Sequence, residues 1–182
     1  IEAVTATNAE AFLYKQEDTL KEIKALLNNT PDVVKALQKL LSEESALKSE
    51  LDTLQRAHAI RLKKELLASS IERSGYRLFV LQGEEKADII KDIAFQLRGE
   101  LQEPFVFVAA TTEGARGLLS VMLSEEAVTL GLHAGNLVKE AARLIQGGGG
   151  GQPHFATAGG KDANGLPQAL ELILSRVDAH AR

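Results

Sequence analysis

The sequence contains no cysteine and no tryptophan, and it has only 6 Phe and 2 Tyr in 182 residues. The absence of cysteine excludes a disulfide scaffold and thiolate metal sites, which fits a cytoplasmic protein. Because aromatic residues are scarce, a core must be built from Leu, Ile, Val and Ala. No apolar run approaches the roughly 20 residues of a membrane-spanning helix, so no membrane partner is expected. The amino end also lacks the basic and apolar regions of a signal peptide.

The chain has little positive charge overall, with a formal net charge of -4. A strongly basic nucleic-acid domain would not have this balance, so any contact with RNA must come from a local patch. One such cluster is present, with six positive residues against Glu65 and Glu72. A solvated helix face is the alternative explanation for this run of charges. The cluster comprises Arg56, Arg61, Lys63, Lys64, Arg73 and Arg77.

The first third of the chain has the pattern of two helices. Thr7 and Glu10 have the spacing of a capping box, and Thr30, followed by Pro31, is placed to cap a second helix that runs to about Ala68. Apolar residues follow a heptad spacing in both segments. Leu13 would face Leu47, Leu20 would face Leu40, and Ile23 would face Leu37, all in one antiparallel register. The pattern predicts a coiled-coil hairpin whose far end, from Leu54 to Leu67, lacks apolar partners on the first helix.

From Ser69 onward, apolar runs typical of buried strands alternate with helical patterns. The runs predict strands at 77–81, 105–109 and 118–123, with the last two paired as a hairpin, and a further strand at 155–160. Helices are expected at 84–101, 133–146 and 166–179. These segments predict a small α/β domain with a mixed sheet of three or four strands and flanking helices.

A run of five glycines, Gly147 to Gly151, follows the second of these helices. It could be a flexible linker. Alternatively, glycine lets backbone N–H groups approach a phosphate closely, in conformations that other residues avoid. Gly159-Gly160-Lys161 would add a second close approach and a positive charge.

Residues 147–162 resemble the terminal signature of alanyl-tRNA synthetases, which also marks the related domain that accompanies DHH-type phosphoesterases. Ile1-Glu2-Ala3-Val4-Thr5 looks like the end of the synthetase's editing domain. The resemblance implies a stub of that domain at 1–6, the helical hairpin at 7–68 and a glycine-rich domain at 69–182. Two residues depart from the family pattern: Gln152 stands where a basic residue is frequent, and Thr157 where Gln is frequent.

In that family the C-terminal region holds tRNA, helps to link aminoacylation with editing, and can contribute to a homodimer. The resemblance thus implies tRNA and the rest of the synthetase as partners, with the ATP, magnesium and zinc of the parent ligase bound elsewhere. No cofactor and no catalysis are expected in this fragment, because its four His show no ligand spacing and no paired carboxylates sit in an apolar setting. His58 falls on the heptad seam and is interpreted as structural. The candidate RNA-binding residues are Gly147, Gly148, Gly149, Gly150, Gly151, Gln152, His154, Gly159, Gly160, Lys161, Arg56, Arg61, Lys63, Lys64 and Arg73.

Two alternative functions stay open. The unpartnered end of the second helix is also typical of a coiled-coil homodimerisation module. The glycine signature would equally suit the substrate-binding half of an oligonucleotide phosphoesterase, although the chain has no Asp-His-His triplet of a catalytic half.

Overall fold

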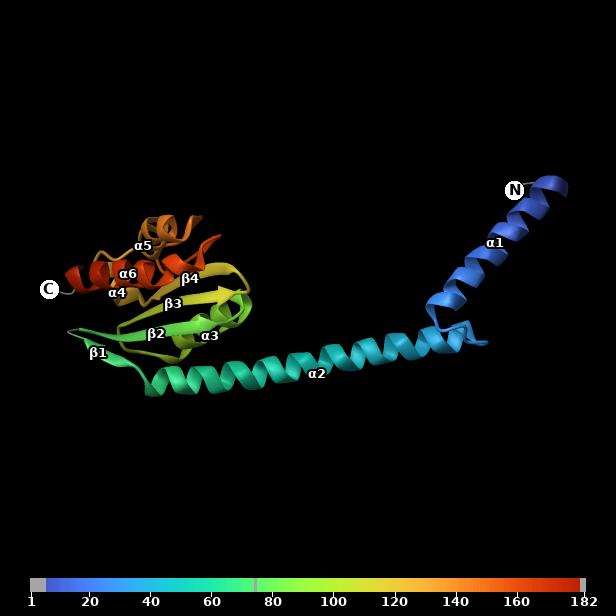
Figure 1. Ribbon diagram of the computed structural model, residues 1–182. Helices are drawn as coiled ribbons and strands as arrows, with labels where there is room; N and C mark the ends of the chain where they lie inside the picture. The colour runs from blue at the N-terminus through green and yellow to red at the C-terminus, as the bar shows by residue number, and fades with distance from the viewer. Residues whose placement is uncertain (1–5, 74, 181–182) are drawn as a thin grey trace. The chain divides into compact units, whose positions relative to one another are not determined.

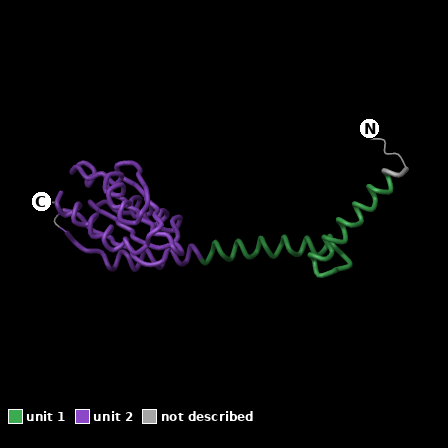
Figure 2. The backbone as a smooth tube through the Cα atoms, turned by 45° about the horizontal axis from the view of Figure 1, so that its top comes forward, with its two compact units in different colours: residues 1–54 green, residues 55–182 purple. Residues whose placement is uncertain are grey.

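The computed structural model describes residues 6–73 and 75–180 (Figure 1). The chain forms two compact units, residues 1–54 and residues 55–182 (Figure 2). The division between them falls inside the second helix, upstream of the boundary expected at residue 68. The expected editing-domain stub lies outside the described residues, apart from Ala6, which begins the first helix.

Two helices form where the heptads predict them: α1 (Ala6–Leu26) and α2 (Val33–Ala68). Asn28 and Asn29 separate them with left-handed φ angles of 57° and 55°, a region that Asn tolerates better than most residues. The side chain that caps α2 is Asp32 and not Thr30, since its carboxylate accepts a hydrogen bond from Lys35 N–H at 2.9 Å. The predicted cap at Thr7 concerns a side chain outside the described part.

The predicted apolar seam of the hairpin is not formed in this structure. Leu13 and Leu47, expected to face each other, are 66% and 65% exposed, and Leu20 and Leu40 are also exposed. The reason is the narrow apolar stripe of α1, which offers few side chains for burial and has Gln16 within its register. Pairing such a stripe buries little apolar surface and so contributes little free energy. Ordering two helices against each other also costs conformational entropy.

The second unit is built on one mixed sheet. β2 and β3 are parallel, and every other neighbouring pair is antiparallel. The predicted hairpin of β3 with β4 is confirmed, with Glu113 opposite Arg116 at its turn. In spatial order the six strands are β1 (Ile71–Arg73), β2 (Tyr76–Glu84), β3 (Phe105–Glu113), β4 (Arg116–Leu123), β6 (Phe155–Gly160) and β5 (Gly147–Gly151).

Helices cover both faces of this sheet (Figure 1). On one face, Phe79, Phe107 and Met122 form a core with Leu66 of α2 and with α3 (Ala87–Glu100). On the other face, side chains from the alternate strand positions form a larger core with the remaining helices. Those helices are α4 (Glu125–Thr129), α5 (Ala134–Ala141) with the 3-10 turn η1 (Ala142–Ile145), and α6 (Leu166–His180) after the 3-10 turn η2 (Ala163–Gly165).

The expectation of three or four strands was wrong, because the sheet has six. The two unpredicted strands, β1 and β5, are its outermost members. β1 spans only three residues, too few for an alternating pattern. β5 consists entirely of glycine, which is depleted in strands and has no side chain to bury.

Candidate nucleic-acid interface

The glycine run forms the outer strand of the sheet and is not a free linker. All five residues of β5 pair antiparallel with β6, from Gly147 opposite Gly160 to Gly151 opposite Ala156. Gln146 precedes the strand in a left-handed conformation, with φ of 51°. Asp162 ties the two strands together at the Gly147–Gly160 end of the ladder, because its carboxylate accepts from the Gln146 amide at 3.2 Å and its N–H donates to the Ile145 carbonyl.

The hydrogen bonds of this hairpin determine which glycines expose their backbone groups. Gln152 N–H donates to the Phe155 carbonyl at 2.8 Å, so these two residues form a hydrogen-bonded pair. Hydrogen-bonded and close, non-bonded pairs alternate along an antiparallel ladder. Gly147, Gly149 and Gly151 therefore occupy the close pairs, and their N–H and C=O groups point away from β6.

The close pairs explain why these positions require glycine. A Cβ added to Gly149 would overlap Cβ of Ala158 and the carbonyl oxygen of Thr157, and one added to Gly147 would overlap the Gly159 carbonyl. A Cβ on Gly148 or Gly150 would meet no atom within 4 Å. None of the five has a left-handed φ. The requirement is thus close backbone approach to β6 and not an unusual φ angle.

Part of this strand edge is covered by α5. A Cβ on Gly135 would lie 2.9 Å from the Gly151 carbonyl oxygen, and Ala134 N–H donates to the Pro153 carbonyl at 2.8 Å. The amino end of α5 therefore packs against the tip of the β5–β6 hairpin. The outward groups of Gly147 and Gly149 are left as the open donors and acceptors of the edge.

Other predicted residues gather beside the glycine strand. Lys161 follows β6 directly and is exposed, and it has no ion-pair partner among the side chains that the structure describes. Gln152 is exposed at the hairpin tip, whereas His154 is half-buried and its backbone carbonyl accepts from Leu123 N–H at 2.8 Å. The structure thus brings together the five glycines of β5 with Gln152, His154, Gly159, Gly160 and Lys161.

The predicted basic cluster lies elsewhere in the unit. β1 and β5 are the two outermost strands, so Arg73 on β1 is separated from the glycines by the whole sheet. Lys63 is bonded to Glu100 at 2.8 Å and is only 17% exposed, and Arg73 lies 3.8 Å from Asp178. Arg61 has a long contact with Glu65 on the same helix.

Of the predicted cluster, Arg56 and Lys64 on α2 have exposed side chains and no acidic partner within the described part of the chain. The cluster and the glycines cannot form one compact site. His58 contacts Glu85 at 2.5 Å, an ion-pair geometry that ties α2 to the loop before α3.

One residue that the sequence did not point to, Phe95, lies beside the glycine hairpin. Phe95 of α3 is 43% exposed, and its ring centroid is 5.1 Å from that of Phe155 on β6. In the sequence, Phe95 stands in an ordinary amphipathic helix, where one more apolar residue is unremarkable. Only its position on the flank of the helix, next to β6, distinguishes it.

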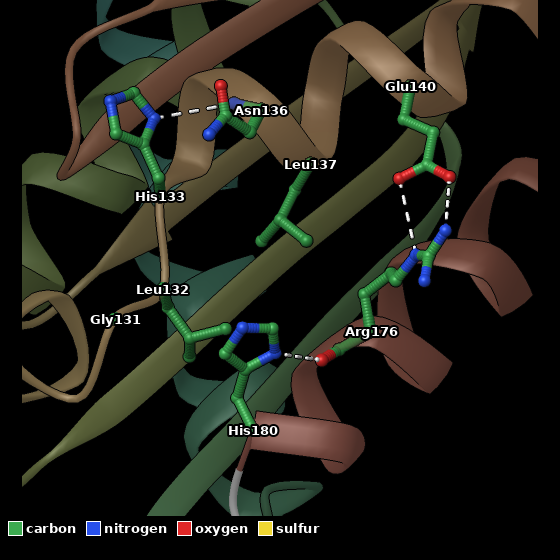
Figure 3. A pocket seen from close by; sticks show the side chains of 8 residues that line it. All are labelled: Gly131, Leu132, His133, Asn136, Leu137, Glu140, Arg176 and His180. Carbon is green, nitrogen blue, oxygen red and sulfur yellow. Dashed lines mark hydrogen bonds and ion pairs between the residues drawn. The ribbon is translucent and has the colours of Figure 1, made fainter.

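A cavity of about 230 Å³ lies between the α4–α5 loop and α6 (Figure 3). His133 on its rim caps α5 by accepting from Asn136 N–H at 3.3 Å, and His180 bonds the Arg176 carbonyl. The Arg176 guanidinium binds both carboxylate oxygens of Glu140 and holds the pKa of that carboxyl below its usual range. His133, Glu140, Arg176 and His180 on the rim thus each have a structural partner.

The described residues include no group of three or more His, Cys, Asp or Glu side chains placed to hold a metal ion. Within the same ranges, no helix is long and apolar enough to cross a membrane.

The fold and the site define a small α/β domain with helices on both faces and a glycine strand at one edge of its sheet. Residues 75–179 match the DHHA1 domain family, and the chain belongs to that family. Its sequence is also similar to proteins named alanine–tRNA ligase, with 48% identity over 98% of this chain for Porphyromonas gingivalis and 44% over 97% for Parabacteroides distasonis. The resemblance carried by the glycine signature is confirmed.

The chain spans 20% of the length of each of these relatives. Among solved structures, the C-Ala domain from Aquifex aeolicus alanyl-tRNA synthetase matches with a TM-score of 0.53 and 22% identity. That match covers 60% of this chain and 98% of the other, so the two share a fold.

Proposed function

We propose that this chain is the tRNA-holding C-terminal region of an alanine–tRNA ligase and that it carries no catalytic step itself. The observation that supports it most is the open edge of β5, where Gly147 and Gly149 present backbone groups beside the unpaired Lys161. Backbone N–H groups and lysine are ligands for phosphate, which fixes a nucleic acid in position without reading its sequence. The identity to alanine–tRNA ligases over nearly the whole chain favours tRNA as that nucleic acid.

In the longer parent enzyme, this module holds the tRNA while the amino acid is attached and checked elsewhere. ATP, magnesium and zinc would act in those upstream parts, and the rest of the synthetase is the module's covalent partner.

One titration tests this function. Folded tRNA, unfolded RNA, duplex DNA and a short single-stranded oligonucleotide are each added to the chain without ATP, alanine or zinc. We expect the tightest binding to folded tRNA, little preference for alanine tRNA over other folded tRNAs, and affinity that falls as salt rises. Equal affinity for the short single strand would favour the substrate-binding half of a phosphoesterase. Aminoacylation or deacylation by the purified chain would contradict the proposal.

Lys161→Ala refines the test. Removing one phosphate contact lowers the slope of log affinity against log salt by about one unit for a helical nucleic acid. Lys64→Ala, which removes an exposed and unpaired lysine of α2, is the matched control. If Lys64→Ala changes the slope and Lys161→Ala does not, tRNA binds the basic face of α2 and not the glycine edge.

Homodimerisation is a second candidate function, favoured by the exposed leucines of the helical unit. Leu40, Leu47, Leu51 and Leu54 are each more than half exposed along α2, and single exposed leucines are common whereas an extended stripe marks an interaction surface. Light scattering over a range of protein concentrations tests it, and a monomer at all concentrations would contradict it. Dimerisation and tRNA binding are compatible.

A further inference from the structure

The face of the sheet that carries α3 is only partly covered by that helix. Phe155 of β6 packs against the core beneath α3, whereas Thr157 and Gly159, which follow at alternate positions, are exposed. Alternate residues of a strand share a face, so all three lie on the α3 side. Gly150 pairs with Thr157 and Gly148 pairs with Gly159. The uncovered floor is therefore made of three glycines and one threonine.

An exposed aromatic ring borders this floor. Phe95 lies on the flank of α3, with its ring tilted by 58° against that of Phe155. It is the only Phe or Tyr of the second unit that is among the exposed large hydrophobic residues described. The floor next to it has no bulky side chain, since Cβ atoms at Gly148 and Gly150 would meet open space. A planar group can therefore approach both the ring and the glycines.

Two cations lie beside the floor, both displaced from Phe95 toward the carboxyl end of β6. Lys91 precedes Phe95 by one helical turn, so the two side chains lie on the same flank of α3. Lys161 follows Gly159 by two residues, at the end of β6 toward which Lys91 lies, because α3 runs antiparallel to β6. Both lysines are exposed, and neither has an ion-pair partner among the described side chains, whereas Arg98 on the same flank is bound to Glu125 at 3.4 Å. Asp88 and Asp92 are the exposed acidic side chains of α3 nearest to Phe95.

We infer that this surface binds an unpaired nucleobase of RNA, which stacks on Phe95 over the glycine floor while Lys91 and Lys161 contact phosphates next to it. The occupant follows from the chemistry: an aromatic face stacks on any base, and cations beside it neutralise the backbone. The floor consists of three glycines and one threonine, a flat surface that suits a planar base better than the side chains of a peptide. This inference rests on the proposed function and adds base stacking to a site otherwise limited to phosphate contacts.

The test compares Phe95→Ala, Phe95→Trp and the control Leu130→Ala, which removes another exposed apolar side chain of the same unit. Each variant is titrated with folded tRNA, and its thermal unfolding is measured. We expect Phe95→Ala to weaken binding by about 5-fold to 100-fold without changing the salt slope, because stacking is lost but no phosphate contact is. Phe95→Trp should restore binding, and its fluorescence should be quenched when tRNA binds. Leu130→Ala should bind like the wild type.

Each outcome decides one point. Wild-type affinity in Phe95→Ala, or unchanged fluorescence of the bound Phe95→Trp variant, would overturn the inference and leave the proposed function intact. Failure of the wild-type chain to bind any RNA would instead contradict the proposed function and the inference together. If Phe95→Ala binds tRNA normally but loses self-association in light scattering, the surface is a contact between protein chains.

Discussion

The two units of this chain differ in where their apolar side chains lie. In the helical unit, Leu13, Leu20, Leu40 and Leu47 are all 45% exposed or more. In the α/β unit, the comparable side chains are buried on both faces of the sheet, and Phe79, Ile93 and Val138 have no exposed surface at all. Burial of apolar surface is the main favourable term in folding. The α/β unit therefore carries its own stability, whereas the helical unit depends on helix propensity and on whatever covers its leucines.

The first way to test this contrast is to truncate one apolar side chain in each unit. Ile93→Ala removes a fully buried side chain and should cost about 2–5 kcal/mol of unfolding free energy. Leu40→Ala, at a position 54% exposed, should change it by no more than about 0.5 kcal/mol. Urea denaturation followed by circular dichroism measures both. A large loss for Leu40→Ala would show that its side chain is buried in solution, and the contrast between the units would fail.

A second test works inside β5. Gly149→Ala places a methyl group where Ala158 and Thr157 already lie, so β5 must move away from β6, at a cost of about 1–3 kcal/mol. Gly150→Ala places the same group in open space and should leave the melting temperature near that of the wild type. Its tRNA affinity should still fall, because the methyl group stands on the proposed RNA-binding floor. Equal melting temperatures for the two variants would contradict the assigned register.

The sequence predicted the elements that bury side chains and missed those that do not. The apolar runs at 77–81, 105–109 and 118–123 correspond to β2, β3 and β4. A short apolar run without a helical period buries all of its side chains most readily as a strand inside the sheet. β5 could not be predicted in this way. Its residues contribute nothing to a core, and their strand conformation depends on close pairing with Ala156 and Ala158 of β6.

The candidate site was predicted in part for the same reason. The glycine signature identified Gly147 to Lys161 as a set, and these residues do lie together. The basic cluster was grouped by its nearness in sequence, yet Lys63 and Arg73 are held by Glu100 and Asp178, which come from distant elements. Such pairs, like the contact of Phe95 with Phe155, arise from tertiary structure. They cannot be predicted from local sequence patterns.

A third test concerns a hydrogen bond that joins the start of β2 to the end of α6. The Tyr76 hydroxyl donates to the Asp178 carboxylate at 2.8 Å. Tyr76→Phe should lower the unfolding free energy by about 1.5 kcal/mol. Burial, and then this hydrogen bond, raises the pKa of Tyr76 above its ordinary value of 10.0.

The raised pKa of Tyr76 determines how the stabilising effect of this hydrogen bond depends on pH. A raised pKa means that the neutral phenol is favoured in the folded state, so its contribution is complete below pH 10 and is lost as the pH rises further. The difference between the wild type and Tyr76→Phe should therefore be constant near neutrality and shrink above about pH 10. A difference that grows in alkali would show that the phenolate, and not the phenol, is stabilised. The melting temperatures of both proteins, measured from neutral pH to above about pH 10, give this difference.

The smallest expected effect tests the helical unit most directly. Leu20 is 45% exposed, so Leu20→Asp should cost only the difference in helix propensity, about 0.5 kcal/mol. Helicity should fall slightly, and the melting of the α/β unit should not change. Leu66→Asp is the matched control, because Leu66 lies in α2 with 2% exposure and packs beneath the sheet, where a charge cannot be solvated. If Leu20→Asp instead abolishes a large part of the helical signal, the heptad register that pairs Leu20 with Leu40 forms in solution. The stability of the helical unit would then come from burial after all.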